Sequence, residues 1–380
     1  MGSSSNGSAE LLRVGPDRSA LEKVLRADVN PGARHRDRHV EPLGRAVIER
    51  VAATGVLAEP GAPWRRWGRT LAWLGYTADE LALPLTLSLQ QSIAKQLLRA
   101  GRPDLEHRYV LPMMRGERTG SFCWSEGADP FDFRTVAAPG RGACVLSGRK
   151  NPVATGVWAD FFLVYARDPI RDDVVVVLVE RADEGVSTEP CHPLGLRSAG
   201  LATLRLDRVT VPADRVLVAN DGIGHAQVLL NERRIALPCI AAGKLEALFE
   251  ALIADLAARH RHGLPVIAMQ AVQAELGRCW AILETMRAVV DRLMAYLDRP
   301  VDPTSTWDAV VAAAKYSVLD QVATMLGIAQ RLLGGTWYHD EEPLGRWMRD
   351  LQGLLPLAGT QAILEVDLGI AAAAQLRGVR

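Results

Sequence analysis

The spacing of apolar residues changes twice along the chain, and this succession restricts the possible folds more than any other feature. Residues 21–98 follow an irregular helical spacing, interrupted by a turn-rich stretch at residues 60–63. Apolar residues then alternate with a period of two in four segments that we expect to be strands: 143–146, 161–165, 174–179 and 204–211. A long helical period returns after residue 220. This order predicts a β domain between two helical domains.

The C-terminal part contains four helical runs. They lie at about residues 245–256, 272–293, 308–333 and 362–376, and the first two carry the apolar stripe of an amphipathic helix. Four long elements favour a four-helix bundle. We therefore predict an α+β chain that is mostly α, with a helical domain at 16–118, a β domain at 119–222 and a bundle at 223–380. Residues 1–15 are expected to be a flexible tail or an expression scar.

The charges of the chain balance, with 44 Lys and Arg against 44 Asp and Glu. Nucleic acid or an anionic membrane would require a basic surface, so the expected partner is a small molecule or a protein. No apolar run approaches the length of a transmembrane helix and no secretory signal opens the chain, which predicts a soluble, cytoplasmic protein. Five scattered cysteines without a CxxC pair favour reduced thiols and indicate no metal site.

Short motifs of the chain occur in a specific order and spacing. They are residues 109–117, 124–126, 148–150, 206–212, 232–234 and 259–263, then Gln270, 334–335, 349–350 and 359–360. Each motif alone is equally an ordinary cap, turn or surface charge. Together they resemble the acyl-CoA dehydrogenase family of flavoproteins, over most of residues 85–373. The resemblance implies that the middle domain is a β-barrel and that the cofactor is FAD.

The resemblance also implies a reaction and a cofactor site. In that family a glutamate removes the α proton of an acyl thioester while the β hydrogen leaves as hydride to the flavin. Trp124 and Ser125 match the strand that faces the flavin, and Arg259 matches an arginine that reaches the pyrophosphate, from a neighbouring subunit. Further dinucleotide contacts are expected from five more residues: Gln270, Gly334, Gly335, and the turn residues Gly359 and Thr360. The implied assembly is a homodimer or homotetramer.

The chain departs from the family pattern at the catalytic base. The usual glutamate precedes the Gly359 position, where this chain has Ala358. A minority of relatives place the glutamate one residue before an arginine that matches Arg234, but Arg233 stands there. Glu232 is one residue further upstream, which on a helix turns its side chain by about 100°. Glu232 and Arg234 are therefore candidate catalytic residues, although a solvated or ion-paired glutamate is the simpler interpretation.

Three functions remain open from the sequence. The first is an atypical FAD-dependent oxidoreductase acting on an acyl thioester of CoA or of an acyl carrier protein, with an electron-transfer partner. Branches of this family work in secondary metabolism such as polyketide biosynthesis, and only five of the 44 basic residues are lysines, as in an arginine-rich, GC-rich genome. The second is a non-catalytic member that serves as a base-free subunit or scaffold. The third is a flavin monooxygenase.

Overall fold

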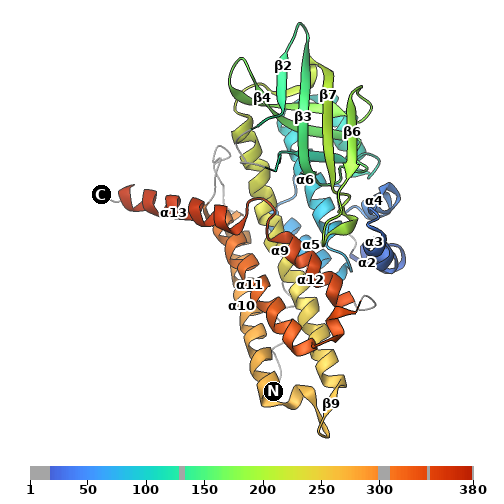
Figure 1. Cartoon of the computed structure of the whole chain (residues 1–380), viewed down its shortest axis with the longest axis vertical. Helices are drawn as coiled ribbons and strands as arrows, with labels where there is room; N and C mark the ends of the chain where they lie inside the picture. Colours follow the sequence, from blue (N-terminus) through green and yellow to red (C-terminus); the bar gives the residue numbers. More distant parts are fainter. Residues whose placement is uncertain (1–17, 128–132, 298–308, 340–342, 379–380) are drawn as a thin grey trace.

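The structure is a computed structural model that describes residues 18–127, 133–297, 309–339 and 343–378. The expected tail at residues 1–15 lies outside the described residues. Figure 1 shows a sheet at one end of an elongated molecule, the N-terminal helices beside it, and long C-terminal helices that extend to the opposite end. The predicted order of helices, strands and helices is confirmed.

The N-terminal domain is built around one buried helix. The elements before the sheet are α2 (Arg18–Val24), η1 (Leu25–Val29), η2 (Asn30–Gly32), α3 (Ala33–His39), α4 (Arg45–Ala52), α5 (Trp64–Thr77), α6 (Ala82–Arg99), α7 (Pro103–Leu105), η3 (Glu106–Val110) and α8 (Leu111–Met114). Every residue of α6 from 82 to 97 is buried except Lys95, because the helix is enclosed by α9, by β1 and by η3. A helix buried on all sides positions its polar residues inside the protein.

The middle domain is a single sheet of eight strands. They are β1 (Gly120–Cys123), β2 (Val136–Pro139), β3 (Ala143–Val153), β4 (Phe161–Asp168), β5 (Asp173–Glu180), β6 (Val186–Pro190), β7 (Ala202–Pro212) and β8 (Val216–Val218). The order is β6-β7-β3-β2-β4-β5-β8, and β1 pairs with β4 in parallel. Strands β6 and β8 lie at the two ends of this order, and within the described residues they do not pair with each other. Hydrogen bonds therefore do not close the sheet into the expected barrel.

Strands β4 and β5 are buried on both faces, which explains their continuous apolar sequences. Phe161, Leu163 and Tyr165 point toward the helices and join the large core that the helical domains share. Phe162 and Val164 point the other way, into a separate core inside the sheet. Because successive side chains point to opposite faces, the sheet packs against the helices through one face only.

The C-terminal domain consists of α9 (Gly222–Ala258), α10 (Gln270–Leu297), α11 (Ala309–Leu333), α12 (Pro343–Leu354) and α13 (Gln361–Gly378). Helix α9 packs on α5 at very short range, since a Cβ added to Gly243 would lie 1.8 Å from the Ala72 carbonyl oxygen. The fourth member of the bundle is α12, which packs on α9 and α11. The helix predicted at 362–376 is α13, which packs on α11 and then projects away from the body (Figure 1).

Helix α11 is the one described helix that is long and apolar enough to cross a membrane by length and composition alone. Its mean hydropathy over 18 residues is 1.2, and half of that window is buried within the protein. Because α11 packs between α9, α10 and α13, this hydropathy is also that of a bundle core helix.

The Arg-Asp motif at 349–350 is a joint between the domains. Asp350 on α12 is buried and accepts hydrogen bonds from the amides of Leu81, at 2.9 Å, and Leu196, at 2.6 Å. Arg349 pairs with Asp37 of α3 at 2.5 Å. One pair of neighbouring residues therefore connects the bundle to the start of α6 and to the segment before β7.

Removal of the Asp350 carboxylate is expected to destabilise the protein. The variant Asp350→Ala leaves two buried amides unpaired, and we expect the free energy of unfolding to fall by about 2–3 kcal/mol. Chemical denaturation of both proteins measures this difference. Asp320→Ala on the exposed side of α11 is the control, and a loss below about 0.5 kcal/mol for Asp350→Ala would contradict the assigned role.

Candidate functional site

The segment that follows β1 is anchored by a buried ion pair. The Lys150 ammonium lies 2.6 Å from Glu126 Oε1 and donates to the Trp124 carbonyl at 3.1 Å. Burial lowers the pKa of Lys150 to about 8, and Glu126 opposes this shift. The Ser125 carbonyl accepts the Asn151 amide at 2.7 Å, and within the described residues the Ser125 hydroxyl has no hydrogen-bond partner. The motifs at 124–126 and 148–150 thus meet and leave the Ser125 hydroxyl available.

The Trp124 ring is part of the core rather than a surface for a ligand. It is 7% exposed and contacts Phe133 and Tyr165 edge-on, with centroid distances of 4.8 and 5.3 Å. The Tyr165 hydroxyl lies 2.8 Å from Nδ1 of His225 on the first turns of α9. Burial, with a contribution from Arg99, lowers the pKa of His225 to about 4, so its ring is neutral. Trp124 therefore lies beside the N-terminal end of α9.

Glu232 is buried on the face of α9 that packs against α6. Its Oε1 lies 3.2 Å from an Arg99 nitrogen, and its Oε2 has no hydrogen-bond partner in the described part of the chain. Burial raises the pKa of Glu232, while Lys95, Arg99 and Ser92 oppose the shift. The expected ion pair is confirmed, but the side chain is 4% exposed and is not solvated. One carboxylate oxygen is thus free inside the protein.

The next residue, Arg233, also faces α6. One guanidinium nitrogen donates to the Leu85 carbonyl at 3.2 Å and to the Ser88 hydroxyl. Ser88, Ser92, Lys95 and Arg99 occupy positions i, i+4, i+7 and i+11 of α6, so they form one helix face. This polar stripe of α6 lies opposite Glu232 and Arg233.

Arg234 points instead to the turn between α12 and α13. Its Nε donates to the Ala358 carbonyl at 3.0 Å, and its guanidinium lies 3.8 Å from Asp367. Burial lowers the pKa of Arg234. Gly359 has a φ of +100°, which favours glycine in the turn, and a Cβ there would lie in ordinary contact with the Arg234 guanidinium at 3.4 Å. The structure therefore joins Arg234 and Gly359, which the sequence had marked separately.

Lys315 on α11 was missed by the sequence analysis. Its ammonium is fully buried and donates to the carbonyls of Leu355, at 3.3 Å, and Gly359. Burial, with repulsion from Arg234, lowers its pKa to about 7. The only signal in the sequence is a single lysine within the apolar run 309–333. Lys315 and Arg234 together hold the turn at Ala358, and Thr360 then begins α13 by accepting the Ile363 amide.

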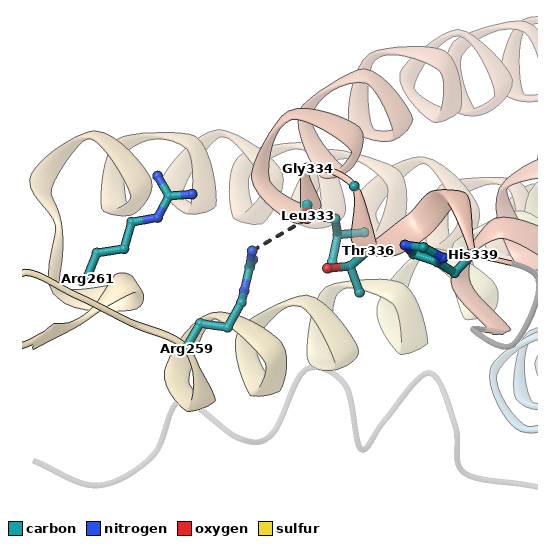
Figure 2. A pocket seen from close by; sticks show the side chains of 7 residues that line it. Arg259, Arg261, Leu333, Gly334, Thr336 and His339 are labelled. Carbon is teal, nitrogen blue, oxygen red and sulfur yellow. Dashed lines mark hydrogen bonds between the residues drawn. The ribbon is translucent and has the colours of Figure 1, made fainter.

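A cavity of about 530 Å³ lies at the other end of α9, as Figure 2 shows. Its lining residues are Arg259, Arg261, Leu333, Gly334, Gly335, Thr336 and His339. The Arg259 guanidinium donates to the carbonyls of Leu332, at 2.8 Å, and Leu333 (Figure 2), and it lies 2.5 Å from Asp255. Among the described residues its Nε has no partner although it is buried. No lining residue is acidic, so the cavity suits an anion.

The candidate residues form separate groups in one copy of the chain. Arg259, Gly334 and Gly335 share the cavity, Gly359 and Thr360 lie beside Arg234, and Trp124 lies beside the start of α9. Gln270 is exposed at the start of α10 and is not in the cavity lining. Helix α9 has 37 residues and a length of about 55 Å at 1.5 Å per residue, and Trp124 lies beside its first turns whereas Arg259 follows its last residue. A single copy therefore does not bring both ends to one ligand.

Family models identify the chain. The acyl-CoA dehydrogenase middle domain matches residues 123–209, and the acyl-CoA dehydrogenase C-terminal domain matches residues 220–373. The chain belongs to the acyl-CoA dehydrogenase family, whose members are FAD-dependent oxidoreductases of acyl thioesters. The expected family, fold and cofactor are thereby confirmed.

Individual relatives are more distant. Benzylmalonyl-CoA dehydrogenase of Aromatoleum aromaticum is 28% identical over 369 residues, which are 91% of this chain and 97% of that protein. A glutaryl-CoA dehydrogenase of Mycobacterium smegmatis, solved with FADH2, has a TM-score of 0.86 at 20% identity and covers 98% and 95% of the two chains. A prolyl acyl carrier protein oxidase has a TM-score of 0.84 at 19% identity, with 98% and 100% covered.

The described residues fit the phosphates of FAD. A pyrophosphate requires donors and positive charge, and the cavity offers both Arg259 and Arg261 together with a buried Arg259 Nε that lacks a partner. Gly334 has a φ of +62°, and a Cβ at Gly334 or Gly335 would meet no atom within 4 Å, so a ligand can approach the backbone there. At the other end of α9, the Ser125 hydroxyl has no partner in the described part of the chain and is available to the flavin.

Proposed function

We propose that the chain oxidises an acyl thioester at its α and β carbons, with FAD as the oxidant and Glu232 as the base. The main supporting observation is Oε2 of Glu232, which is enclosed by protein and has no hydrogen-bond partner among the described residues. It belongs to a carboxylate with a raised pKa. A base with a raised pKa holds an abstracted proton more firmly than a solvated carboxylate. FAD, when bound, supplies the acceptor for the hydride that leaves the β carbon.

The neighbours of Glu232 have distinct roles in this proposal. Arg99 holds Oε1 at 3.2 Å, while Oε2 keeps no partner among the described residues. Burial of the site excludes water, which would otherwise compete for the proton. Arg234 and Lys315 fix the turn at Ala358, the position where most relatives carry their base. Arg234 is therefore a positioning residue rather than a proton carrier.

The proposed cofactor site lies between two copies of the chain. The β-domain side, with Trp124 and Ser125, comes from one copy, and the cavity with Arg259 comes from the other, because within one chain they lie at opposite ends of α9, a helix of about 55 Å. The turn at 359–360 and Gln270 belong to the same shared site. A homodimer or homotetramer is supported by α13, which projects from the body and leaves Val366 62% and Ile370 65% exposed.

The proposed substrate arm is pantetheine, which CoA and acyl carrier proteins share. The fold accommodates a carrier-bound substrate, since the prolyl acyl carrier protein oxidase shares it. We place the activity in the cytoplasm and in secondary metabolism, such as polyketide biosynthesis, with a separate protein or small molecule accepting the electrons. The arginine-rich composition and the departure at Ala358 support a specialised role over general fatty-acid oxidation.

A non-catalytic role is the second candidate. It is favoured by Ala358 and Arg233, which replace both glutamate positions used by relatives. A base-free subunit would retain the fold and the interface while a partner chain performs the reaction. In that case Glu232 would only neutralise Arg99 and Lys95.

The absorption spectrum of the purified protein distinguishes the two candidates. We expect about one FAD per chain, identified after release by denaturation, and loss of the visible flavin absorbance when a suitable thioester is added without oxygen. The matched control is the same thioester with its β carbon fully substituted, which has no hydrogen to transfer. Absence of flavin even after reconstitution with excess FAD would favour the non-catalytic role.

A further inference from the structure

Arg233 is a half-buried cation without a paired anion among the described residues. Its guanidinium donates to a backbone carbonyl and to the Ser88 hydroxyl, and no carboxylate of the described residues lies within ion-pair distance. Burial lowers the pKa of Arg233 to about 10, yet the side chain stays charged at neutral pH and partly accessible to solvent. A charge that is partly removed from water is unfavourable unless a counter-charge or hydrogen bonds compensate it, so a bound anion at Arg233 would be stabilising.

The charges around Arg233 leave a positive surplus. The basic side chains Lys95, Arg99 and Arg234 accompany it, against the two acids Glu232 and Asp367. Glu232 is held by Arg99, and Asp367 lies 3.8 Å from Arg234, so both acids are engaged.

Lys95 has another compensation, since its ammonium lies 4.0 Å from the centre of the Trp64 ring. Arg233 remains the cation for which the described residues supply no anion. A bound molecule that carries an anionic group would supply this missing charge.

The position of Arg233 indicates which molecule that is. It stands between Glu232, the proposed base, and Arg234, which holds the turn at Ala358. A group bound to Arg233 is therefore part of the acyl group that reacts at Glu232. The phosphates of the cofactor are not assigned to Arg233, because the cavity that suits them supplies its own cations, Arg259 and Arg261.

We propose that Arg233 binds a carboxylate on the acyl group of the substrate, so that this chain acts on the monothioester of a dicarboxylic acid. The planar guanidinium matches a carboxylate with two parallel hydrogen bonds. A cationic acyl group is disfavoured at the same place by repulsion. This assignment rests on the proposed function, because it requires the acyl group to lie between α6 and α9.

Binding of matched pantetheine thioesters tests the assignment without turnover. The pairs are glutaryl- against valeryl-pantetheine and adipyl- against hexanoyl-pantetheine, each measured by calorimetry without oxygen on protein whose bound FAD has first been reduced chemically, so that it cannot accept a hydride. We expect the carboxylate to strengthen binding roughly 10- to 100-fold, the range for a buried charge-assisted hydrogen bond. We expect Arg233→Met to abolish that preference and Arg233→Lys to keep part of it. Arg115→Met, an exposed arginine paired with Glu117, is the control and should keep the full preference.

The outcomes separate this assignment from the proposed function. If the alkyl thioesters bind and reduce the flavin as well as the dicarboxylic ones, the proposed function stands and the assignment of Arg233 is overturned. An equal loss of affinity for both members of a pair in Arg233→Met overturns it too, since a purely structural arginine gives that result. If neither member of any pair binds the FAD-loaded protein, the proposed function fails and this assignment fails with it. Should Arg233→Met not fold, the wild-type preference and Arg233→Lys still decide.

Discussion

Glu232→Gln is expected to abolish proton removal while leaving flavin binding intact. The amide keeps the size of the side chain and can still bond Arg99, but it cannot take up a proton. Loss of a positioned general base lowers turnover by roughly 10²- to 10⁴-fold. The direct measurement is exchange of the substrate α proton for deuterium, followed by nuclear magnetic resonance in heavy water, because exchange reports the base separately from the hydride step. Glu250→Gln, on the exposed side of the same helix, should exchange at the wild-type rate.

The pH dependence of α-proton exchange should reflect the raised pKa of Glu232. The base works as the ionised carboxylate, so exchange should be constant at high pH and should fall as pH decreases through a value above the ordinary range for glutamate. The raised pKa also means that the folded state binds the proton more tightly than the unfolded state. The contribution of Glu232 to stability is therefore greatest at low pH and is lost as pH rises through the folded pKa.

A second glutamate should compensate for the loss of the first. Ala358→Glu places a carboxylate where most of the family carries it, at a backbone φ of +55° that alanine already adopts. In the Glu232→Gln background we expect this change to restore part of the α-proton exchange. Full exchange in Glu232→Gln alone would show that another group is the base.

The order of domains was predictable because it depends on periodicity, whereas the contacts that complete the sheet were not. Strand β1 has only four residues, and its Gly120 is held at both backbone atoms by the Gln90 side chain of α6, at 2.9 and 3.1 Å. No periodicity in the sequence reveals such a contact. Helix α12 was missed for a related reason: it is short and flanked by proline and glycine, while the more apolar α13 was predicted.

At the site, the residue types were predictable but their directions were not. Glu232, Arg233 and Arg234 are consecutive, and a helix turns each by about 100° from the last. Only the packing of α6 and of the turn at Ala358 decides that the first two face one element and the third faces another. The burial of Lys315 was unpredictable for the same reason. Its partners are backbone carbonyls, which the fold supplies and the sequence does not specify.

Arg259→Met is expected to weaken FAD binding by roughly 10- to 100-fold, since it removes charge-assisted hydrogen bonds to the phosphates. Fluorescence titration of the apoprotein with FAD measures this change. Arg205→Met, an exposed arginine on β7 paired with Glu189, is the control and should bind FAD normally. Because Arg259 also contacts Asp255 and the end of α11, the thermal midpoint of the apoprotein must be measured alongside to separate cofactor contact from folding.

A mixture of two defective variants is expected to recover FAD binding if the site is shared between copies. Ser125→Tyr blocks the β-domain side of the site, and Arg259→Met removes the phosphate side. A dimer of either variant alone therefore contains no complete site. When both are produced together, each mixed dimer combines an intact Ser125 of one copy with an intact Arg259 of the other. About a quarter of all sites should then bind FAD with normal affinity, given random pairing of a symmetric dimer. If both groups served one site within a single copy, the mixture would recover nothing, because neither chain carries both intact residues.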